Sequence, residues 1–190
     1  MRPLNQISPS TRRQTGMTLI ELLVTVLILA VGLLGMAGLQ SRLQQSEMEA
    51  YQRSQALILL QDMASRIAVN RNAAASYVTS ATGLGGVGVT CPTATATQQQ
   101  RDAAEWCNAL QGAGETSGGN RVGAMIGGRG CVEALPGGEY LLTVAWQGMV
   151  PLAAPPAGVA CGVNLYNNTT NCAGDICRRV VTTIVRIATL

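Results

Sequence analysis

One carboxylate, Glu21, stands at the start of a long apolar stretch. From Leu22 to Leu39 no residue carries a charge, and this length is close to the roughly 20 residues that a helix needs to cross a bilayer. An ionised carboxylate on such a segment costs roughly 2.5 to 3.5 kcal/mol at the bilayer centre and less near its surface. We therefore expect Glu21 to have a partner of opposite charge.

The residues before this stretch are polar and basic. Arg2, Arg12 and Arg13 face no acidic residue upstream of Gly16, and a cationic flank of this kind keeps the amino end of the chain in the cytoplasm. An ordinary secretory signal is cleaved after its apolar region, whereas removal of residues 1–16 would leave the apolar helix attached. A plain single-span anchor with an incidental glutamate is the alternative interpretation.

Gly16, Met17 and Glu21 together resemble the class III leader of type IV pilins and their relatives. In that family a membrane aspartyl protease cleaves after the glycine and methylates the new terminus. The resemblance implies cleavage between Gly16 and Met17, N-methylation of Met17, and a role in subunit assembly for Glu21, the fifth residue of the mature chain. It also implies that the mature amino group of Met17, in the same chain or in an adjacent subunit, neutralises Glu21. Met17 replaces the phenylalanine most often found at this position, where the family accepts other large apolar residues.

All six cysteines lie beyond the apolar stretch, and an even number on the exported side predicts disulfide bonds in an oxidising periplasm. They are Cys91, Cys107, Cys131, Cys161, Cys172 and Cys177. A zinc site would need closer pairs such as CxxC, which this sequence lacks. The sequence does not choose among the many possible pairings, although chain proximity favours Cys91 with Cys107. The other expected pairs are Cys161 with Cys172 and Cys131 with Cys177.

Composition excludes several classes of function. All 13 basic residues are arginines, and three of them precede Gly16, so the segment after Gly16 carries as many acids as arginines. The formal charge of +3 is therefore a signal of membrane topology and does not indicate nucleic-acid binding. Histidine is absent, which excludes His triads and His metal sites. With no GxSxG motif and no close pair of acids, we expect neither an enzyme nor a cofactor.

The segment GLGGVG at residues 83–88 formally matches the GxGxxG fingerprint of dinucleotide-binding proteins. That fingerprint works because its glycines open a helix whose amino end holds pyrophosphate. Here Val89, Thr90 and Pro92 follow, and they predict a turn or a strand. We therefore expect no nucleotide site.

The helical pattern continues beyond the apolar stretch, since residues 41–75 contain neither proline nor glycine. Apolar positions recur at spacings that fit one helical face: Leu39, Leu43, Ala50, Leu57, Leu60, Ala64 and Ile67. After the leader at 1–16 that the resemblance implies, this pattern predicts one continuous helix at 17–75 with a transmembrane segment at 17–39, followed by a globular domain at 76–190. A coiled-coil dimer is the alternative, but the heptad is not sustained.

The globular part reads as a mixture of helix and strand. A short helix is predicted at 101–110, with Trp106 packing in the core. The clearest strand is 139–148, where Tyr140, Leu142, Val144 and Trp146 alternate with the residues between them and turn residues stand on both sides. Further strands are predicted at 178–188 and 130–135. An antiparallel sheet with one face on the long helix is the economical solution. The predicted fold class is therefore α+β and pilin-like.

Within the pilin relatives, the string VGLLGMAGLQ at residues 31–40 is most similar to minor pilins of the PilV type, and the proline usual in the major pilin is absent. The resemblance implies a minor pilin that joins a complex initiating type IV pilus assembly, at or near the pilus tip. A pseudopilin of a type II secretion system is the alternative. The implied partners are other minor pilins, the major pilin, the prepilin peptidase and inner-membrane lipid, with the globular domain in the periplasm before assembly into the pilus.

Overall fold

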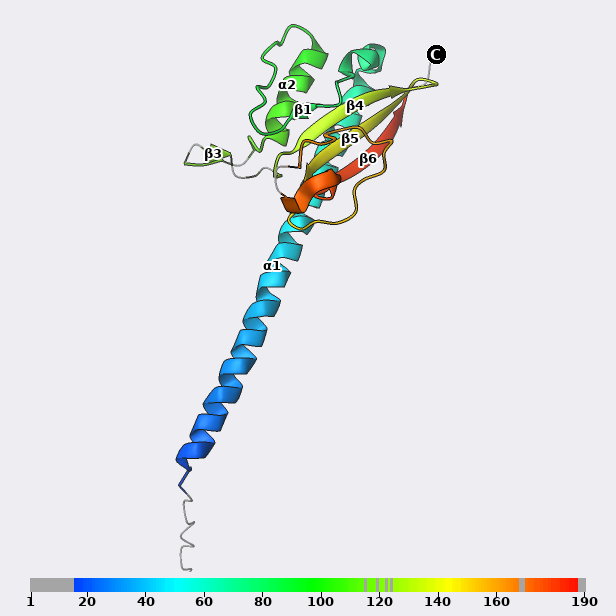
Figure 1. The fold of residues 1–190 in the computed structure, drawn as a ribbon. Coiled ribbons are helices and arrows are strands. Elements are labelled where there is room, and N and C mark those ends of the chain that lie inside the picture. Colours follow the sequence, from blue (N-terminus) through cyan, green and yellow to red (C-terminus); the bar gives the residue numbers. More distant parts are fainter. Residues whose placement is uncertain are drawn as a thin grey trace, which may run out of the picture. The chain divides into compact units, whose positions relative to one another are not determined.

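The computed structural model describes residues 16–114, 116–118, 120–121, 123, 125–167 and 170–187. It divides the chain into two compact units, Met1–Gln44 and Gln45–Leu190, each described by itself below (Figure 1). The predicted leader, apart from Gly16, lies outside the described residues. So does Ala188, the last residue of the strand predicted at 178–188.

The long predicted helix is present as α1 (Leu19–Val69), but it ends before the predicted position near Ala75. Asn70 leaves the helical region with φ −100° and ψ 41°, and a 3-10 helix, η1 (Arg71–Tyr77), follows. The Asn70 amide donates a hydrogen bond to the Tyr77 hydroxyl at 3.0 Å. The helix is therefore shorter than the absence of proline and glycine predicted, and the contact between Asn70 and Tyr77 joins its end to η1.

In the second unit, α1 buries a narrow stripe of side chains. Its members recur every three or four residues: Gln52, Ala56, Leu60, Met63 and Ile67. Leu60 and Ile67 were predicted on the buried face, whereas Leu57, also predicted there, is 48% exposed. The predicted face was displaced around the helix, since it did not include Gln52, Ala56 or Met63, which are buried.

Four antiparallel strands form the main sheet in the order β1-β4-β5-β6. Their bounds are β1 (Leu84–Gly85), β4 (Arg129–Leu135), β5 (Glu139–Gln147) and β6 (Arg178–Arg186). A separate antiparallel pair consists of β2 (Thr116–Ser117) and β3 (Asn120–Arg121). The three strands predicted from the sequence are confirmed as β4, β5 and β6, and the α+β fold class with a long amino-terminal helix is confirmed.

One face of the sheet packs on α1 and on a second helix, α2 (Gln98–Leu110). Figure 1 shows the second-unit part of α1 running behind the strands, with α2 beside it. Trp106 of α2 is fully buried, and its indole N–H donates to the Leu59 carbonyl of α1 at 2.9 Å. Gly130 makes room for this ring, because a Cβ there would lie 2.1 Å from a Trp106 ring carbon. The predicted packing role of Trp106 is confirmed.

The second helix begins earlier than predicted. It starts at Gln98 rather than Arg101, because Thr97 caps it: the Thr97 hydroxyl accepts from the Gln100 N–H at 3.2 Å. The Gln100 side chain in turn accepts from the Thr97 N–H at 3.2 Å. This reciprocal pair is a capping box, and its Thr-x-x-Gln signature is visible in the sequence.

Three disulfides join the six cysteines. Cys91 pairs with Cys107 as predicted, with the Cα atoms 5.6 Å apart. The other two predicted pairs are wrong, since Cys131 joins Cys161 and Cys172 joins Cys177. The register of β4 places Cys131 on the sheet face away from α1, and the loop after β5 folds back over that face.

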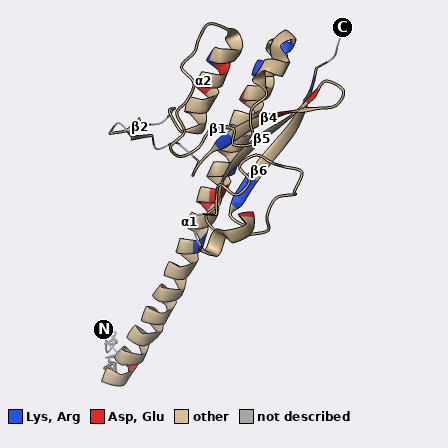
Figure 2. Cartoon of the chain, turned by 45° about the horizontal axis from the view of Figure 1, so that its top comes forward, with Lys and Arg blue, Asp and Glu red and all other residues tan. Residues whose placement is uncertain are grey.

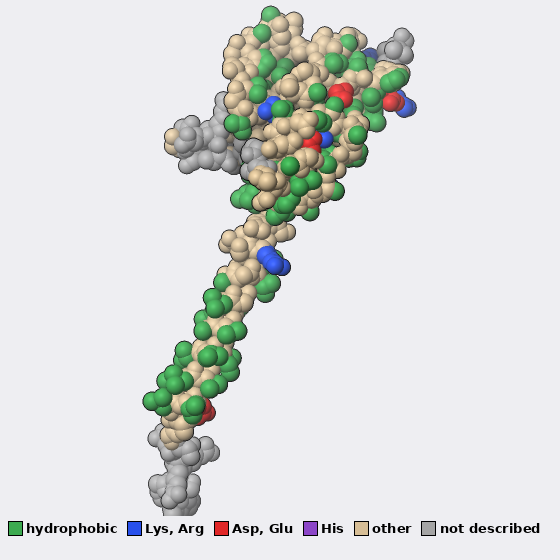
Figure 3. Space-filling model, viewed as in Figure 1, with side chains coloured by type: hydrophobic (Ala, Val, Ile, Leu, Met, Phe, Trp, Pro, Cys, Tyr) green, Lys and Arg blue, Asp and Glu red, His purple; other side chains and the backbone are tan. Residues whose placement is uncertain are grey.

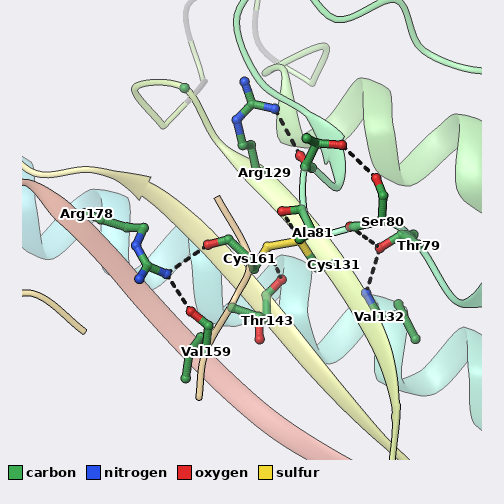
Figure 4. Close-up of a disulfide and its surroundings, with 12 residues drawn as sticks. Thr79, Ser80, Ala81, Arg129, Cys131, Val132, Thr143, Val159, Cys161 and Arg178 are labelled. Atoms are coloured by element: carbon green, nitrogen blue, oxygen red, sulfur yellow. Dashed lines mark hydrogen bonds between the residues drawn. A yellow bond between two sulfur atoms is a disulfide. The ribbon is translucent and has the colours of Figure 1, made fainter. Parts of the chain in front are cut away.

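The loop carrying Cys161 is held over the sheet by a buried arginine as well as by the disulfide. One Arg178 nitrogen donates to the carbonyls of Val159 and Cys161 at 2.8 and 3.0 Å (Figure 4). Its guanidinium also lies 3.2 Å from the Asp175 carboxylate. Cys172–Cys177, by contrast, closes only a short turn next to β6.

The three disulfides should contribute unequally to stability. On the chain-entropy relation, the Cys131–Cys161 link, with a sequence separation of 30, contributes about 3.6 kcal/mol, and Cys172–Cys177, with a separation of 5, about 2 kcal/mol. Paired Cys→Ser replacements in the full-length protein should therefore lower the melting temperature most for the former pair. Calorimetry with and without reductant checks this, and the opposite order would contradict it.

Candidate functional site

Glu21 lies in the first turn of α1, and Thr18 caps that turn. The Thr18 carbonyl accepts from the Leu22 N–H at 3.2 Å, and the Thr18 hydroxyl accepts from the Glu21 N–H at 3.4 Å. The first turn of a helix carries unpaired N–H groups and the positive end of the helix dipole, which favour a carboxylate. Within the described part of the chain, no side chain pairs with the Glu21 carboxylate.

Gly16 and Met17 precede the helix, and both are exposed. Because α1 begins at Leu19, Met17 is not yet on a helical face with Glu21 in the full-length chain. Its nitrogen is here part of a peptide bond and carries no charge. The pairing of Glu21 with a mature amino group, and the cleavage between Gly16 and Met17, therefore stay predictions.

The part of α1 that follows Glu21 exposes its apolar side chains all round. Leu34, for example, is 74% exposed and Leu27 64%, and Figure 3 shows apolar side chains along this stretch. The helix contains a window long and apolar enough to cross a membrane, and no residue of that window is buried. A helix that is apolar on every side requires lipid or other helices around it.

A second group of charged residues, in the globular unit, is paired internally. Arg66 of α1 contacts three carboxylates: Asp62 at 2.9 Å, Asp102 at 2.9 Å and Glu105 at 2.7 Å. The last two belong to α2, so this guanidinium joins the helices. Burial alone would lower the pKa of Arg66, but the three carboxylates raise it.

Asp102 is the buried centre of this group, with 3% of its surface exposed. It accepts hydrogen bonds from the Tyr77 hydroxyl at 2.5 Å, the Gln98 amide at 2.9 Å and Arg66. Burial favours the neutral carboxyl, but these donors outweigh it and lower the pKa of Asp102. Burial and the neighbouring carboxylate raise the pKa of Tyr77 to about 12. The group therefore ties η1 and α2 to α1.

Glu49 fixes a third contact of α1 inside the globular unit. Its carboxylate accepts from the Met149 N–H at 3.0 Å and lies 3.6 Å from an Arg179 nitrogen. Arg179 also donates to the carbonyls of Val150 and Ile176, at 2.5 and 3.1 Å. The loop after β5 and the start of β6 are thereby fastened to the helix.

The contacts of Arg66, Asp102 and Glu49 join elements of the globular unit to one another, which is a structural role. The described residues include no cluster of three or more potential metal ligands. The glycine-rich segment 83–88 forms β1 and a turn, as predicted, and the Gly86 N–H donates to the Gly128 carbonyl at 2.7 Å. No helix starts there to receive a phosphate, which leaves Glu21 and the exposed apolar stretch as the candidate functional site. Figure 2 shows how sparsely charged that stretch of α1 is.

The sequence analysis missed the Arg66 group. The spacing of Asp62 and Arg66, four residues apart on a helix, is a readable signal. Nothing local indicates Asp102 and Glu105, since they meet Arg66 only after α2 packs on α1. The Thr-x-x-Glu pattern at 18–21 is a capping signature and could have indicated that the helix begins at Leu19.

Two protein-family models match the chain. A model described as type IV pilin Tt1218 matches residues 38–113, and a model of the prokaryotic N-terminal methylation motif matches residues 11–37. The second match contains Gly16, Met17 and Glu21. Comparison with the curated proteins and with the solved structures gave no match.

The lowered pKa of Asp102 predicts an acid-sensitive contribution to stability. A carboxyl with a lowered pKa stabilises the fold above its ordinary value of 3.8, and the contribution is lost as the pH falls through the lower folded value. Asp102→Asn should cost about 1–3 kcal/mol at pH 7, with the difference from wild type shrinking below about pH 4. Melting curves of the full-length protein in detergent from pH 7 to pH 3 measure this.

Glu105→Gln is the matched control for that experiment, because the Glu105 side chain is 63% exposed. An exposed ion pair contributes about 1 kcal/mol or less. A loss for Glu105→Gln as large as that for Asp102→Asn, or a pH-independent loss for Asp102→Asn, would contradict the assignment.

Proposed function

Since the two family matches identify the chain as a type IV pilin with a prepilin N-terminal methylation motif, we propose that it is a minor pilin of a complex that initiates pilus assembly, at or near the pilus tip. Membership of this family also makes it a structural protein and not an enzyme. Pilin partners and processing by a prepilin peptidase follow from the same matches.

The observation that carries the proposal is Glu21, a carboxylate without a partner in the described chain at the start of an exposed apolar helix. In lipid or in a bundle of helices such a charge costs several kcal/mol unless an opposite charge meets it. Cleavage after Gly16 would create a positive amino group at Met17. That group on a neighbouring subunit would neutralise Glu21 and set the axial register between subunits.

The basic flank and the apolar stretch support a single-pass topology in the inner membrane. The amino end would remain cytoplasmic and the globular domain periplasmic, where the three disulfides can form. The prepilin peptidase would then remove residues 1–16 and methylate Met17. Inner-membrane lipid surrounds the helix until the subunit joins the pilus.

Two features favour a minor pilin of the PilV type. The string at residues 31–40 resembles those proteins, and α1 contains no proline. The six cysteines, paired in three disulfides in the globular unit, also favour a minor pilin over a pseudopilin. A pseudopilin of a type II secretion system would share the leader and Glu21, and it is the second candidate.

Processing at Gly16 predicts the terminus of the mature protein. Mass spectrometry of protein purified from its native membrane should find a chain that begins with N-methylated Met17. A strain without prepilin peptidase should retain Met1 and serves as the control. Cleavage downstream of Met17 in the presence of the peptidase would refute the proposed leader.

Glu21→Ala tests assembly directly. It removes the charge but leaves α1 more apolar, so insertion and leader cleavage should persist while incorporation into the pilus-initiating complex falls. Complementation of a deletion strain with wild type or Glu21→Ala, followed by immunoblots of sheared pili, measures the effect. Glu47→Ala, which removes an exposed acid of the same helix outside the apolar stretch, should behave as wild type.

The deletion strain itself separates the two candidate functions. It should make few surface pili while still producing major pilin. Wild-type numbers of pili together with a defect in protein secretion would refute the minor-pilin proposal in favour of the pseudopilin.

A further inference from the structure

The two edges of the main sheet differ in length and in protection. At one edge, β1 comprises only Leu84–Gly85, and very short edge strands are one of the ways in which proteins prevent unwanted pairing. At the other edge, β6 extends over Arg178–Arg186 and pairs only with β5 among the described strands. Figure 1 shows β6 as the outermost strand.

The hydrogen-bond pattern shows which groups of β6 point outward. The Ile187 N–H donates to the Gly138 carbonyl, and the Cys177 carbonyl accepts from the Gly148 N–H, so odd-numbered residues face β5. Even-numbered residues therefore direct their N–H and C=O groups away from the sheet. The Leu152 N–H confirms this direction, because it donates to the Ile176 carbonyl at 2.8 Å.

Beyond Ile176 the described residues leave the outer edge of β6 open. Within the described part of the chain, no backbone group pairs with the outward groups of Thr182, Ile184 and Arg186. The side chains of Thr182 and Ile184 are exposed, Ile184 by 56%. The run from Val180 to Val185 contains no charge and no proline, and its pairing with β5 has no bulge. Among the residues described, none of the usual protections of an edge strand is present there.

We propose that the Thr182–Arg186 edge of β6 is a docking site for an extended segment of another polypeptide, which adds to the sheet as a further strand. The outward N–H and C=O groups of β6 can all form hydrogen bonds with the backbone of one extended segment. This pairing is the basis of recognition by strand addition. The partner should carry β-branched or aromatic residues opposite Thr182 and Ile184. An acidic residue near Arg186 would complement the charge at the end of the strand.

A second copy of this chain does not fit the edge. Glu49 lies against Arg179, so α1 enters the globular unit at the beginning of β6. In an antiparallel pair of two β6 strands, the two α1 helices would enter from opposite ends, which two chains anchored in one membrane cannot do. A parallel pair would bring Arg178, Arg179 and Arg186 of each copy beside those of the other, and adjacent like charges are destabilising. The partner is therefore a different exported chain.

Site-specific cross-linking in cells that make the full-length protein tests this inference. The described cysteines are all in disulfides, so Ile184→Cys supplies a free thiol that can carry benzophenone maleimide. Irradiation should yield an adduct with one exported partner, and the linked residues should lie within a short contiguous segment of it. Val87→Cys is the control, because Val87 is 83% exposed and follows β1 at the opposite edge of the sheet.

Thr182→Pro, added to Ile184→Cys, removes one outward N–H and leaves the ladder to β5 intact, since proline is accepted on the free side of an edge strand. Loss of one hydrogen bond should lower the adduct yield by about two- to tenfold. If the proline variant does not fold, Thr182→Lys replaces it, because lysine on an edge strand prevents pairing. It should also lower the adduct yield. Unchanged yield in a folded variant, an adduct with a second copy, or no adduct at all would overturn the inference.

The inference uses the membrane anchoring and export proposed above but does not depend on the minor-pilin role. Failure of the deletion strain to lose pili would remove the minor-pilin proposal but leave the adduct in place. Conversely, a strain that loses pili but shows no adduct with the Ile184→Cys variant would retain the proposed function and remove the docking edge.

Discussion

The burial of one narrow stripe of α1 holds the globular unit together. Leu60, Met63 and Ile67 lie against the sheet and α2, and each fully buried side chain of this size contributes about 1.5–3 kcal/mol. Trp106 bridges the layers, because its ring packs over Gly130 while its N–H reaches the α1 backbone. The helix therefore covers one face of the sheet, while a second buried cluster that includes Cys131, Ala145 and Cys161 lies on the other.

The same helix meets two different electrostatic conditions. In the globular unit, the charge of Arg66 is matched by three carboxylates and partly shielded from water, so its partners come from the fold itself. Glu21 has no such partner in the described chain, and no part of that chain encloses it. Arg66 therefore joins two helices within the fold, whereas a charge that would neutralise Glu21 must come from outside the described residues.

The Cys131–Cys161 disulfide and the buried Arg178 fix the position of the loop after β5. Cys131–Cys161 and Arg178 hold the loop after β5 against the face away from α1. Within the described residues, they leave the outer edge of β6 without cover beyond Ile176.

The sequence by itself determined the features that depend on local pattern or on the membrane. Lack of charge predicted the exposed apolar helix, alternation between turn signals predicted β5, and the motif around Gly16 indicated the family. The tertiary structure decided the rest: which stripe of α1 is buried, which cysteines pair, and where Arg66 finds its carboxylates. These depend on the register of β4 and on the packing of α2 against α1, and neither is encoded in the spacing of neighbouring residues. Cys131 and Cys161, 30 residues apart in sequence, meet because a strand presents one and a returning loop presents the other.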